Sequence, residues 1–233
     1  TCALPIWLGR YGRHALGGLH DELVDDRLEI SRLLEDPKLA IGAGAVLQDL
    51  ERFGSVVVGP GLGTEGSTLA QSALVVEQSP VPVVVDADGL RVFEGVVGKV
   101  NRRSVVVITP HDGEYRRLTG RAVDQDRVAA ARDLAFRLGV VVLLKGPTTV
   151  VADPTGRAVM VTSGTSHLAT AGSGDVLGGM IGAVLASGVD PLHGAAAAAH
   201  WHGRAGALGG RGMIASDLGD ILGPALRDMM ESS

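Results

Sequence analysis

The sequence predicts an α/β fold built on a mostly parallel central sheet with helices on both faces. Short runs of Val, Ile and Leu recur along the chain, with segments of helix length between them. Each run is apolar at consecutive positions, as expected of strands that are buried on both faces. With 45% hydrophobic but only 3% aromatic residues, Val, Leu and Ala must build the core. Such βαβ alternation favours a doubly wound sheet with right-handed crossovers.

The first half of the chain supplies the parallel part of this sheet. Apolar runs predict the strands, and amphipathic segments between them predict helices that pack on the sheet. We expect strands at Ser55–Gly59, Pro82–Asp86, Ser104–Thr109 and Val140–Lys145, and helices at Ser67–Gln78, Asp112–Gly120 and Asp124–Leu138.

The second half begins with a predicted hairpin, Thr148–Ala152 and Ala158–Thr162, which turns through "DPTG". Three helices then follow by their period. Asp190 and Ser216 are expected to cap the second and third of them, because their side-chain oxygens can accept from the first helical amides. The predicted helices are Asp175–Ser187, Pro191–Leu208 and Ser216–Met230.

The 233 residues show no internal repeat or linker, so we expect a single domain over 1–233. The opening "TCALPIWLGR" lacks Met and resembles neither a strand nor an amphipathic helix. We therefore expect an artefactual start within residues 1–7 of a truncated gene fragment. A processed or trimmed chain is the alternative.

Charge and cysteine content exclude several classes of protein. The net charge of −5 provides no basic surface, so neither nucleic acid nor an anionic membrane is expected as a partner. Cys2 is the only cysteine, which excludes a disulfide framework and a cysteine metal site. A reducing cytoplasm is the expected compartment. The sequence has neither an apolar run long enough to span a membrane nor an export signal.

The strongest chemical signal is "ATAGSGDVLGG", Ala169–Gly179. Gly172, Ser173 and Gly174 bring unhindered backbone N–H groups to the start of a helix, where the helix dipole also favours a phosphate. Asp175 in the first turn would lie beside a phosphoryl group and could accept a hydroxyl proton during in-line attack. An ordinary Gly-rich turn is the alternative.

A second signal is "LLKGPTTVV", which ends a predicted strand with a cation, a bare backbone and two hydroxyls. These groups can contact the ribose and phosphates of a nucleotide at the edge of a sheet. The segment is not a Walker A loop, because G-x-x-x-x-G-K-[ST] is absent. An edge lysine with a simple turn is the alternative. The residues concerned are Lys145, Gly146, Pro147, Thr148 and Thr149.

Gly61-x-Gly63-x-x-Gly66 follows an apolar run, and Asp86 lies twenty positions beyond Gly66. This spacing matches a dinucleotide-binding Rossmann unit. A dehydrogenase would, however, leave the two segments above without a role. Pro60 also removes a backbone donor from the loop that would hold the pyrophosphate. The loop still indicates close approach of backbone to a ligand.

"ITPHDGEYRRLTG" places His111 and Glu114 at the carboxyl end of a predicted strand, where open α/β sheets bind ligands. A lone His–Glu pair is more often structural, and His111 is a poor metal ligand without further donors. His200 and His202 lie two apart on a helix and do not share a face. We interpret them as packing and surface residues.

Taken together, five segments resemble the ADP-dependent NAD(P)H-hydrate dehydratases of the ribokinase-like superfamily. The resemblance starts near Ser55 and implies a ribokinase-like three-layer α/β/α fold. The segments are "VVGPGLG", "VVVDADGL", "ITPHDGEYRRLTG", "VVLLKGPTTVVA" and "LATAGSGDVLGGMIGAVLASGVDP", with a trailing "HGRAG".

The resemblance implies repair of damaged cofactor: the S epimer of NADH or NADPH hydrate is dehydrated while ADP becomes AMP and phosphate. It implies ADP or ATP as co-substrate, Mg²⁺ to offset phosphate charge, no protein metal ligands, and a homo-oligomer, a tetramer in the family. Asp175 would be the base that touches the substrate hydroxyl. Gly172–Gly174 would hold phosphate, Lys145–Thr149 the nucleotide, and Gly61, Gly63, His111 and Glu114 the hydrated dinucleotide.

The sequence departs from the family pattern at Asp112, Ala171 and Thr165-Ser166-His167, which bears on substrate fit. The family's opening strand, Gly-Ser loop and Gly-Ala helix start are not recognised, so a first βα unit is expected to be missing. Two alternatives remain: a small-molecule kinase of the hydroxymethylpyrimidine or thiazole type, and a non-catalytic nucleotide-binding remnant.

Overall fold

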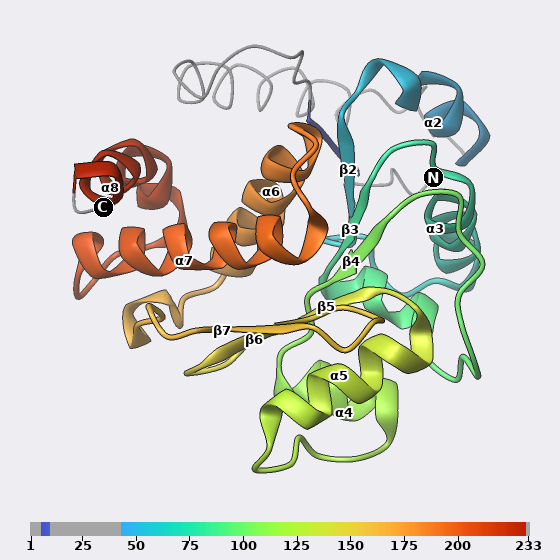
Figure 1. The fold of residues 1–233 in the computed structure, drawn as a ribbon. Coiled ribbons are helices and arrows are strands. Elements are labelled where there is room, and N and C mark those ends of the chain that lie inside the picture. The colour runs from blue at the N-terminus through green and yellow to red at the C-terminus, as the bar shows by residue number, and fades with distance from the viewer. Residues whose placement is uncertain (1–5, 10–42, 232–233) are drawn as a thin grey trace.

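A computed structural model describes residues 6–9 and 43–231, which form a twisted seven-stranded sheet with helices on both faces (Figure 1). The strands lie in the sheet in chain order, β1 to β7. Their bounds are β1 Ile6–Gly9, β2 Ser55–Val58, β3 Val83–Val85, β4 Val106–Ile108, β5 Val141–Leu144, β6 Thr149–Ala152 and β7 Ala158–Val161.

The predicted fold class is confirmed. β2, β3, β4 and β5 pair in parallel, and each of the four falls within a predicted apolar run. The predicted hairpin forms as β6 and β7, which extend the sheet with antiparallel pairs. β1 adds an antiparallel strand at the opposite edge, next to β2. Five of the seven strands therefore run in one direction, and their carboxyl ends meet at one edge.

Consecutive residues of each central strand face opposite layers of the protein. Val56 and Val58 of β2 belong to one buried cluster, whereas Val57 between them belongs to the other. All three are at most 3% exposed. This arrangement explains why the strands are apolar at every position, since both faces of the sheet are covered.

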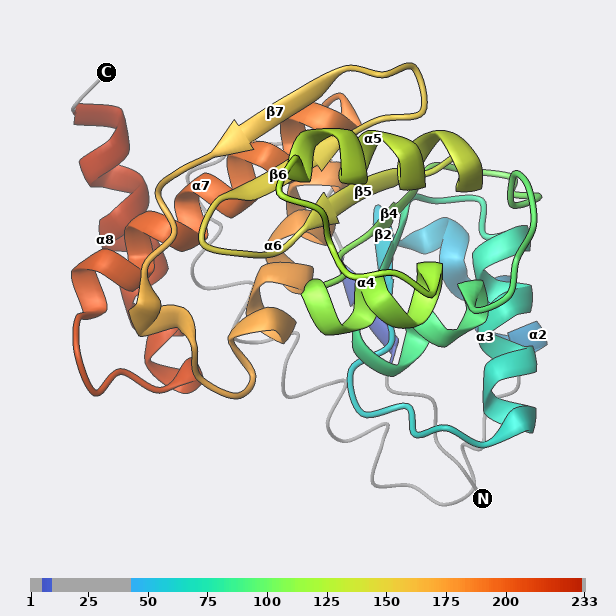
Figure 2. The ribbon, with the colours of Figure 1, turned by 90° about the horizontal axis from the view of Figure 1, so that it is seen from below.

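Helices α2 to α5 contribute to one cluster and α6 to α8 to the other (Figure 2). On the second side, α6 packs against β1–β3 and α7 against β5–β7. The bounds are α2 Ala43–Asp49, α3 Gly66–Gln78, α4 Asp112–Thr119, α5 Arg127–Leu138, α6 Ser173–Ala186, α7 Pro191–Gly209 and α8 Leu218–Glu231.

Local chemistry sets several helix boundaries. Asp190 caps α7 as predicted, because its Oδ1 accepts from the His193 amide, and Pro191 occupies the first helical position. Asp126 caps α5 in the same way through Ala129. Gly120 and Gly139 end α4 and α5 in left-handed conformations.

Several expectations are wrong or incomplete. The opening residues were expected to form no strand, yet Ile6–Gly9 pairs with β2 as β1. Of the expected artefactual start, residues 1–5 lie outside the described residues, as do residues 10–42. The Ser216 cap is also wrong, because Ser216 lies within a 3₁₀ turn and α8 begins at Leu218. The helix α2 and the 3₁₀ segment η2, Ala87–Phe93, were not anticipated.

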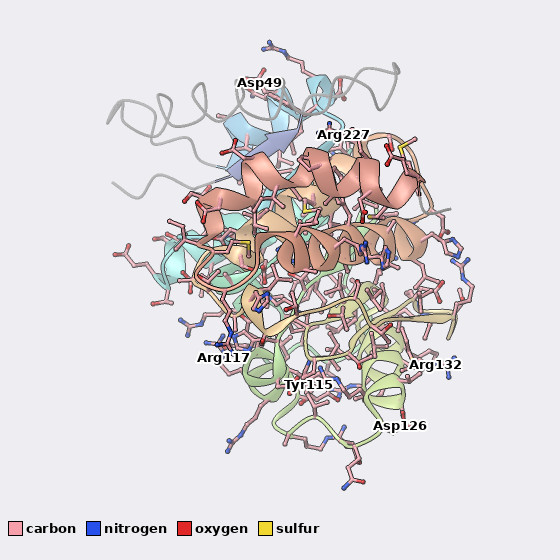
Figure 3. The ribbon with its side chains drawn as sticks, turned by 90° about the vertical axis from the view of Figure 1, so that its left-hand side faces the viewer. Asp49, Tyr115, Arg117, Asp126, Arg132 and Arg227 are labelled. Atoms are coloured by element: carbon pink, nitrogen blue, oxygen red, sulfur yellow. The ribbon has the colours of Figure 1, made fainter. Side chains whose placement is uncertain are left out.

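Figure 3 shows the molecule from the side of α7 and α8. Arg227 of α8 and Arg132 of α5 are exposed, whereas Tyr115 of α4 is buried beneath the sheet's other face. Within the described ranges, no helix combines the length and the apolar character that crossing a membrane requires.

Candidate functional site

Three segments that follow parallel strands meet at the carboxyl edge of the sheet. Asp86 follows β3, Lys145 follows β5, and His111 lies just beyond β4. Backbone hydrogen bonds continue the ladder at this edge: the Asp86 amide donates to Val58 and the Lys145 amide to Pro110. This is the edge at which open parallel sheets bind ligands.

Lys145 lies between two carboxylates. Its Nζ is 2.7 Å from Oδ1 of Asp86 and 3.8 Å from Oε2 of Glu114. The side chains of Asp86 and Glu114 are only 2% and 7% exposed, whereas that of Lys145 is 20% exposed. The two buried carboxylates therefore orient the ammonium group of Lys145, and part of it stays exposed to solvent. A charged group in this position can bind a phosphate.

The amino end of α6 adjoins this ion pair. A Cβ built on Gly174 would lie 3.5 Å from Oδ2 of Asp86 and 3.6 Å from Nζ of Lys145. These are ordinary contact distances, so the start of α6 lies directly beside both charged groups. The predicted phosphate turn and the predicted nucleotide lysine, far apart in sequence, are thus brought together.

Among the described residues, no side chain caps α6. Its N-cap is Gly172, with a φ of 85°, and no side-chain hydrogen bond is made there. The amides of Ser173 and Asp175 donate to Thr170 and Gly172, but the Gly174 amide has no acceptor among the described residues. An uncapped helix start with an open N–H and an adjacent lysine can hold an anion.

Asp175 occupies the first turn of α6 and is exposed. Partial burial among protein atoms raises its pKa, the negative charge of Asp86 raises it further, and Lys145 opposes both. A raised pKa makes the carboxylate a stronger base. Asp175 can therefore accept a proton from a hydroxyl placed beside a phosphoryl group.

His111 and Glu114 form a reciprocal cap at the start of α4. The Nδ1 of His111 accepts from the amides of Gly113 and Glu114, and the Glu114 carboxylate accepts from the His111 amide at 2.8 Å. Because Nδ1 is an acceptor, Nε2 carries the proton of the neutral ring. His111 is exposed at the sheet edge, so this structural role leaves the ring open to a ligand.

Arg127 supports the 145–149 segment, which was not foreseen from the sequence. Its guanidinium donates to the Lys145 carbonyl at 2.8 Å and pairs with Asp112 at 2.9 Å. A Cβ on Gly146 would lie 2.4 Å from the guanidinium, so a larger residue there would displace the Arg127 side chain. Pro147 is exposed and Thr148 and Thr149 are partly buried, which leaves the segment accessible.

The opening glycine loop lies at the same edge, after β2. Its backbone packs tightly against the chain at Gly59, which has a φ of +139° and where a Cβ would lie 1.7 Å from the Asp86 carbonyl oxygen. Gly61 and Gly63 also have positive φ. The Gly63 amide donates to Asp88 at 3.0 Å, which ties the loop to the segment after Asp86.

Sequence reasoning missed Asp86 as a site residue. Its position directly after a buried strand was a usable signal, but its spacing from the glycine loop was attributed to a dinucleotide motif. His202, interpreted as a packing or surface residue, is buried and lies beside Ser173. Its neighbour His200 is exposed, as expected.

Across residues 6–9 and 43–231, no three His, Cys, Asp or Glu side chains converge to hold a metal ion. A cavity of about 410 Å³ lies away from the charged cluster, between α2, α3 and the segment before β4. Its lining mixes acidic and basic side chains without the phosphate-binding elements above. The residues around it are Leu47, Glu51, Glu77, Gln78, Pro80, Asn101, Arg102 and Arg103.

Comparison with known proteins points to one family. A family model described as NAD(P)H-hydrate dehydratase matches residues 23–222. The match starts upstream of Ser55, so the likeness extends further toward the amino end than the sequence motifs indicated.

Relatives and solved structures agree with this match. The bifunctional NAD(P)H-hydrate repair enzyme Nnr of Mycobacterium leprae is 49% identical over 158 residues, which cover 67% of this chain. The chain spans about a third of the length of that relative, 33%. An ADP/ATP-dependent NAD(P)H-hydrate dehydratase from Bacillus subtilis, co-crystallised with ATP and Mg²⁺, superposes with a TM-score of 0.68 at 32% identity, covering 76% of this chain and 65% of that one.

A ribokinase-like superfamily protein from Enterococcus faecalis shares the fold, with a TM-score of 0.67 and 22% identity over 88% of this chain and 74% of that one. The ribokinase-like architecture expected from the sequence is therefore confirmed.

Proposed function

The chain belongs to the NAD(P)H-hydrate dehydratase family, and we propose that it dehydrates the S epimer of NADH or NADPH hydrate, using ADP and releasing AMP and phosphate. One observation carries the proposal for this chain. The Lys145–Asp86 pair, the uncapped start of α6 and Asp175 lie together at the carboxyl edge of the sheet.

The proposed chemistry solves a leaving-group problem. Hydroxide leaves poorly at neutral pH, whereas phosphate leaves well. In the first step the C6 hydroxyl of the hydrated nicotinamide attacks the β-phosphorus of ADP, and the bond from that phosphorus to the AMP oxygen breaks. In the second step the C6–O bond breaks, phosphate departs, and a proton lost from C5 restores the C5–C6 double bond.

Each part of the site has a role in the first step. Asp175 accepts the hydroxyl proton as the attack proceeds, which its raised pKa favours. The Gly172–Gly174 turn and Lys145 stabilise the transferring phosphate through N–H groups and positive charge. The segment from Lys145 through Gly146, Pro147 and Thr148 to Thr149 contacts the nucleotide.

The hydrated dinucleotide takes the remaining part of the edge. Gly61, Gly63, His111 and Glu114 line its site in this proposal, because their segments follow β2 and β4 toward the same edge. The Nε2–H group of His111, whose nitrogen lies 3.5 Å from Oε1 of Glu114, is the donor of this ring that a ligand oxygen would meet.

Mg²⁺ fits the donor set as a companion of the nucleotide. It favours oxygen ligands and usually binds through one or two carboxylates together with phosphates. The carboxylates beside Lys145, those of Asp86 and Glu114, are buried and already paired with that lysine, so nucleotide phosphates and water would hold the ion. When bound, the ion offsets phosphate charge.

The test is an absorbance assay on this chain. The protein is incubated with hydrated NADH or NADPH, Mg²⁺, and either ADP or ATP. We expect the absorbance of the reduced nicotinamide to return, with one AMP formed per turnover when ADP is used. Phosphorylation of a thiazole or hydroxymethylpyrimidine alcohol without any dehydration would instead support a kinase. Nucleotide binding without either reaction would support a non-catalytic remnant.

The proposal also covers the cellular compartment and the oligomeric state of the protein. With Cys2 as the only cysteine, we place the activity in the cytoplasm. We expect the 233 residues to form a single domain. The family resemblance supports assembly of this domain into a homo-oligomer, namely a tetramer. Light scattering after size-exclusion chromatography measures the assembly directly, and a monomer would contradict this part of the proposal.

A further inference from the structure

The segment "HGRAG", His202–Gly206 in the middle of α7, has no part in the chemistry proposed above. Its residues nevertheless lie against the chain that leads into α6. That chain is the 163–173 segment, which follows β7 and ends at the phosphate turn. The question is what this contact does.

Two glycines let α7 and the 163–168 segment touch closely. A Cβ on Gly203 would lie 2.6 Å from the carbonyl oxygen of Ser163, and one on Gly206 would lie 2.5 Å from Leu168. Ser163 also donates to the His200 carbonyl at 3.2 Å. The segment is therefore seated on α7 along more than one helical turn before it reaches Gly172.

His202 continues this contact at the end of the segment. Its Nε2 lies 3.4 Å from Oγ of Ser173, the first residue of α6. His202 and Ser173 are 6% and 4% exposed, so water does not compete for this pair. Burial lowers the pKa of His202 to about 4; a hydrogen bond with the Ser173 backbone opposes this shift, and the positive charge of Lys145 adds a smaller lowering. The ring is neutral at physiological pH and can exchange one hydrogen bond with the hydroxyl.

The start of α6 needs such a support. Its cap, Gly172, contributes no side-chain hydrogen bond, and the Gly174 amide is left open. A turn that holds a reacting phosphate supports fast transfer only if its position is fixed beforehand, because a shift of about 1 Å can lower the rate by about 100-fold. The His202–Ser173 contact fixes the turn from the buried side and leaves the opposite side, facing Lys145 and Asp86, to the ligand.

We propose that His202 is a positioning residue that acts through Ser173 to hold the phosphate-binding turn at the start of α6. The inference rests on the proposed function only for its turnover readout. The contact itself and its effect on anion binding stand independently of the reaction.

The experiment is a double-mutant cycle with His202→Phe and Ser173→Ala. Phe keeps the ring volume and removes the hydrogen bond, and Ala removes the hydroxyl. We expect each single variant to lower kcat by about 10- to 100-fold, with KM for the hydrate nearly unchanged. The double variant should lose no more than the worse single variant, because both remove the same interaction.

Two further variants separate positioning from folding. His202→Gln retains an amide that can reach the hydroxyl, and it should recover most of the lost kcat. His200→Phe, at the exposed neighbour on the same helix, should behave like the wild type. The melting temperature of every variant is measured alongside. A loss in His202→Phe that follows only the melting temperature, and that His202→Gln does not reverse, overturns the proposal.

The same cycle is measured by calorimetry with AMP and with inorganic phosphate, without turnover. Both single variants should weaken phosphate binding, and their effects should again be non-additive. If the wild type does not dehydrate the hydrate, the proposed function fails while this binding cycle still decides the inference. Independent, multiplicative effects of the two substitutions, or wild-type behaviour of His202→Phe, would refute it.

Discussion

The Nζ of Lys145 lies 2.7 Å from Oδ1 of Asp86, and the negative charge of Asp86 in turn raises the pKa of Asp175. One buried carboxylate therefore contacts the lysine proposed to bind phosphate and also raises the pKa of the proposed base. The two effects can be separated by experiment, because one concerns affinity and the other concerns proton uptake.

Asp86→Asn should shift the pH profile. Without the charge of Asp86, the pKa of Asp175 falls toward its ordinary value and the opposing effect of Lys145 is strengthened. The base then stays ionised at lower pH, so the acid limb of kcat/KM should move to lower pH. Asp124→Asn, at an exposed site, is the control. An acid limb that stays in place or moves to higher pH would show that the charge of Asp86 does not raise the pKa of Asp175.

Asp175→Ala should abolish turnover with little loss of nucleotide affinity. Loss of a general base typically costs about 100- to 10,000-fold in rate, whereas the open Gly174 amide and Lys145 remain to bind phosphate. Single-turnover absorbance and nucleotide calorimetry measure the two properties. Asp220→Ala, at an exposed carboxylate of α8, is the matched control. Near-normal rates in Asp175→Ala would disprove the base assignment.

Gly59→Ala should be far more damaging than Gly63→Ala. At Gly59 a Cβ would lie 1.7 Å from the Asp86 carbonyl oxygen, whereas nothing lies within 4 Å of one at Gly63. Gly63→Ala adds only left-handed strain, about 1–2 kcal/mol. Gly59→Ala should exceed about 4 kcal/mol, in the range that severe steric clashes reach. Urea unfolding measures both. Equal losses would mean that the approach of the two chain segments does not restrict residue 59.

His202 should make stability depend on acid pH. Burial lowers its pKa to about 4 from 6.5, so the unfolded chain takes up a proton between these values and the folded chain does not. Stability is fully present above pH 6.5 and falls as the pH drops toward 4, by about 3 kcal/mol in total. His202→Gln should flatten this part of the profile relative to the wild type, as urea unfolding at stepped pH would show. Parallel profiles would mean that His202 titrates normally.

The central strands could be predicted because burial on both faces leaves a direct mark in the sequence. Val56, Val57 and Val58 must all be apolar when each face of β2 is covered. The β6–β7 hairpin was equally visible from its turn residues. By contrast, β1 was missed because its place depends on pairing with β2. Short runs of this kind carry little information without their partner.

Part of the candidate site could be predicted because some of its residues lie in local sequence motifs. Lys145 and Asp175 are recognisable from local motifs, but their proximity depends on how α6 returns to the edge of β3. Asp86 has the same placement after a strand as Lys145, and only the fold shows which side chain it pairs with. The role proposed for His202 could not be found from the sequence, because the face of α7 that meets the 163–168 segment is fixed by tertiary packing around Gly203 and Gly206.

The missing side-chain cap at Gly172 has a consequence for the protein in the cell. A nucleotide phosphate bound as proposed would accept from the Gly174 amide and complete the first turn of α6, so occupancy and folding would become linked equilibria. At a ligand concentration of about 100 times Kd this linkage is worth about 2.7 kcal/mol. The lifetime of the folded chain would then follow the supply of adenine nucleotide, and a depleted pool would favour its turnover by proteases.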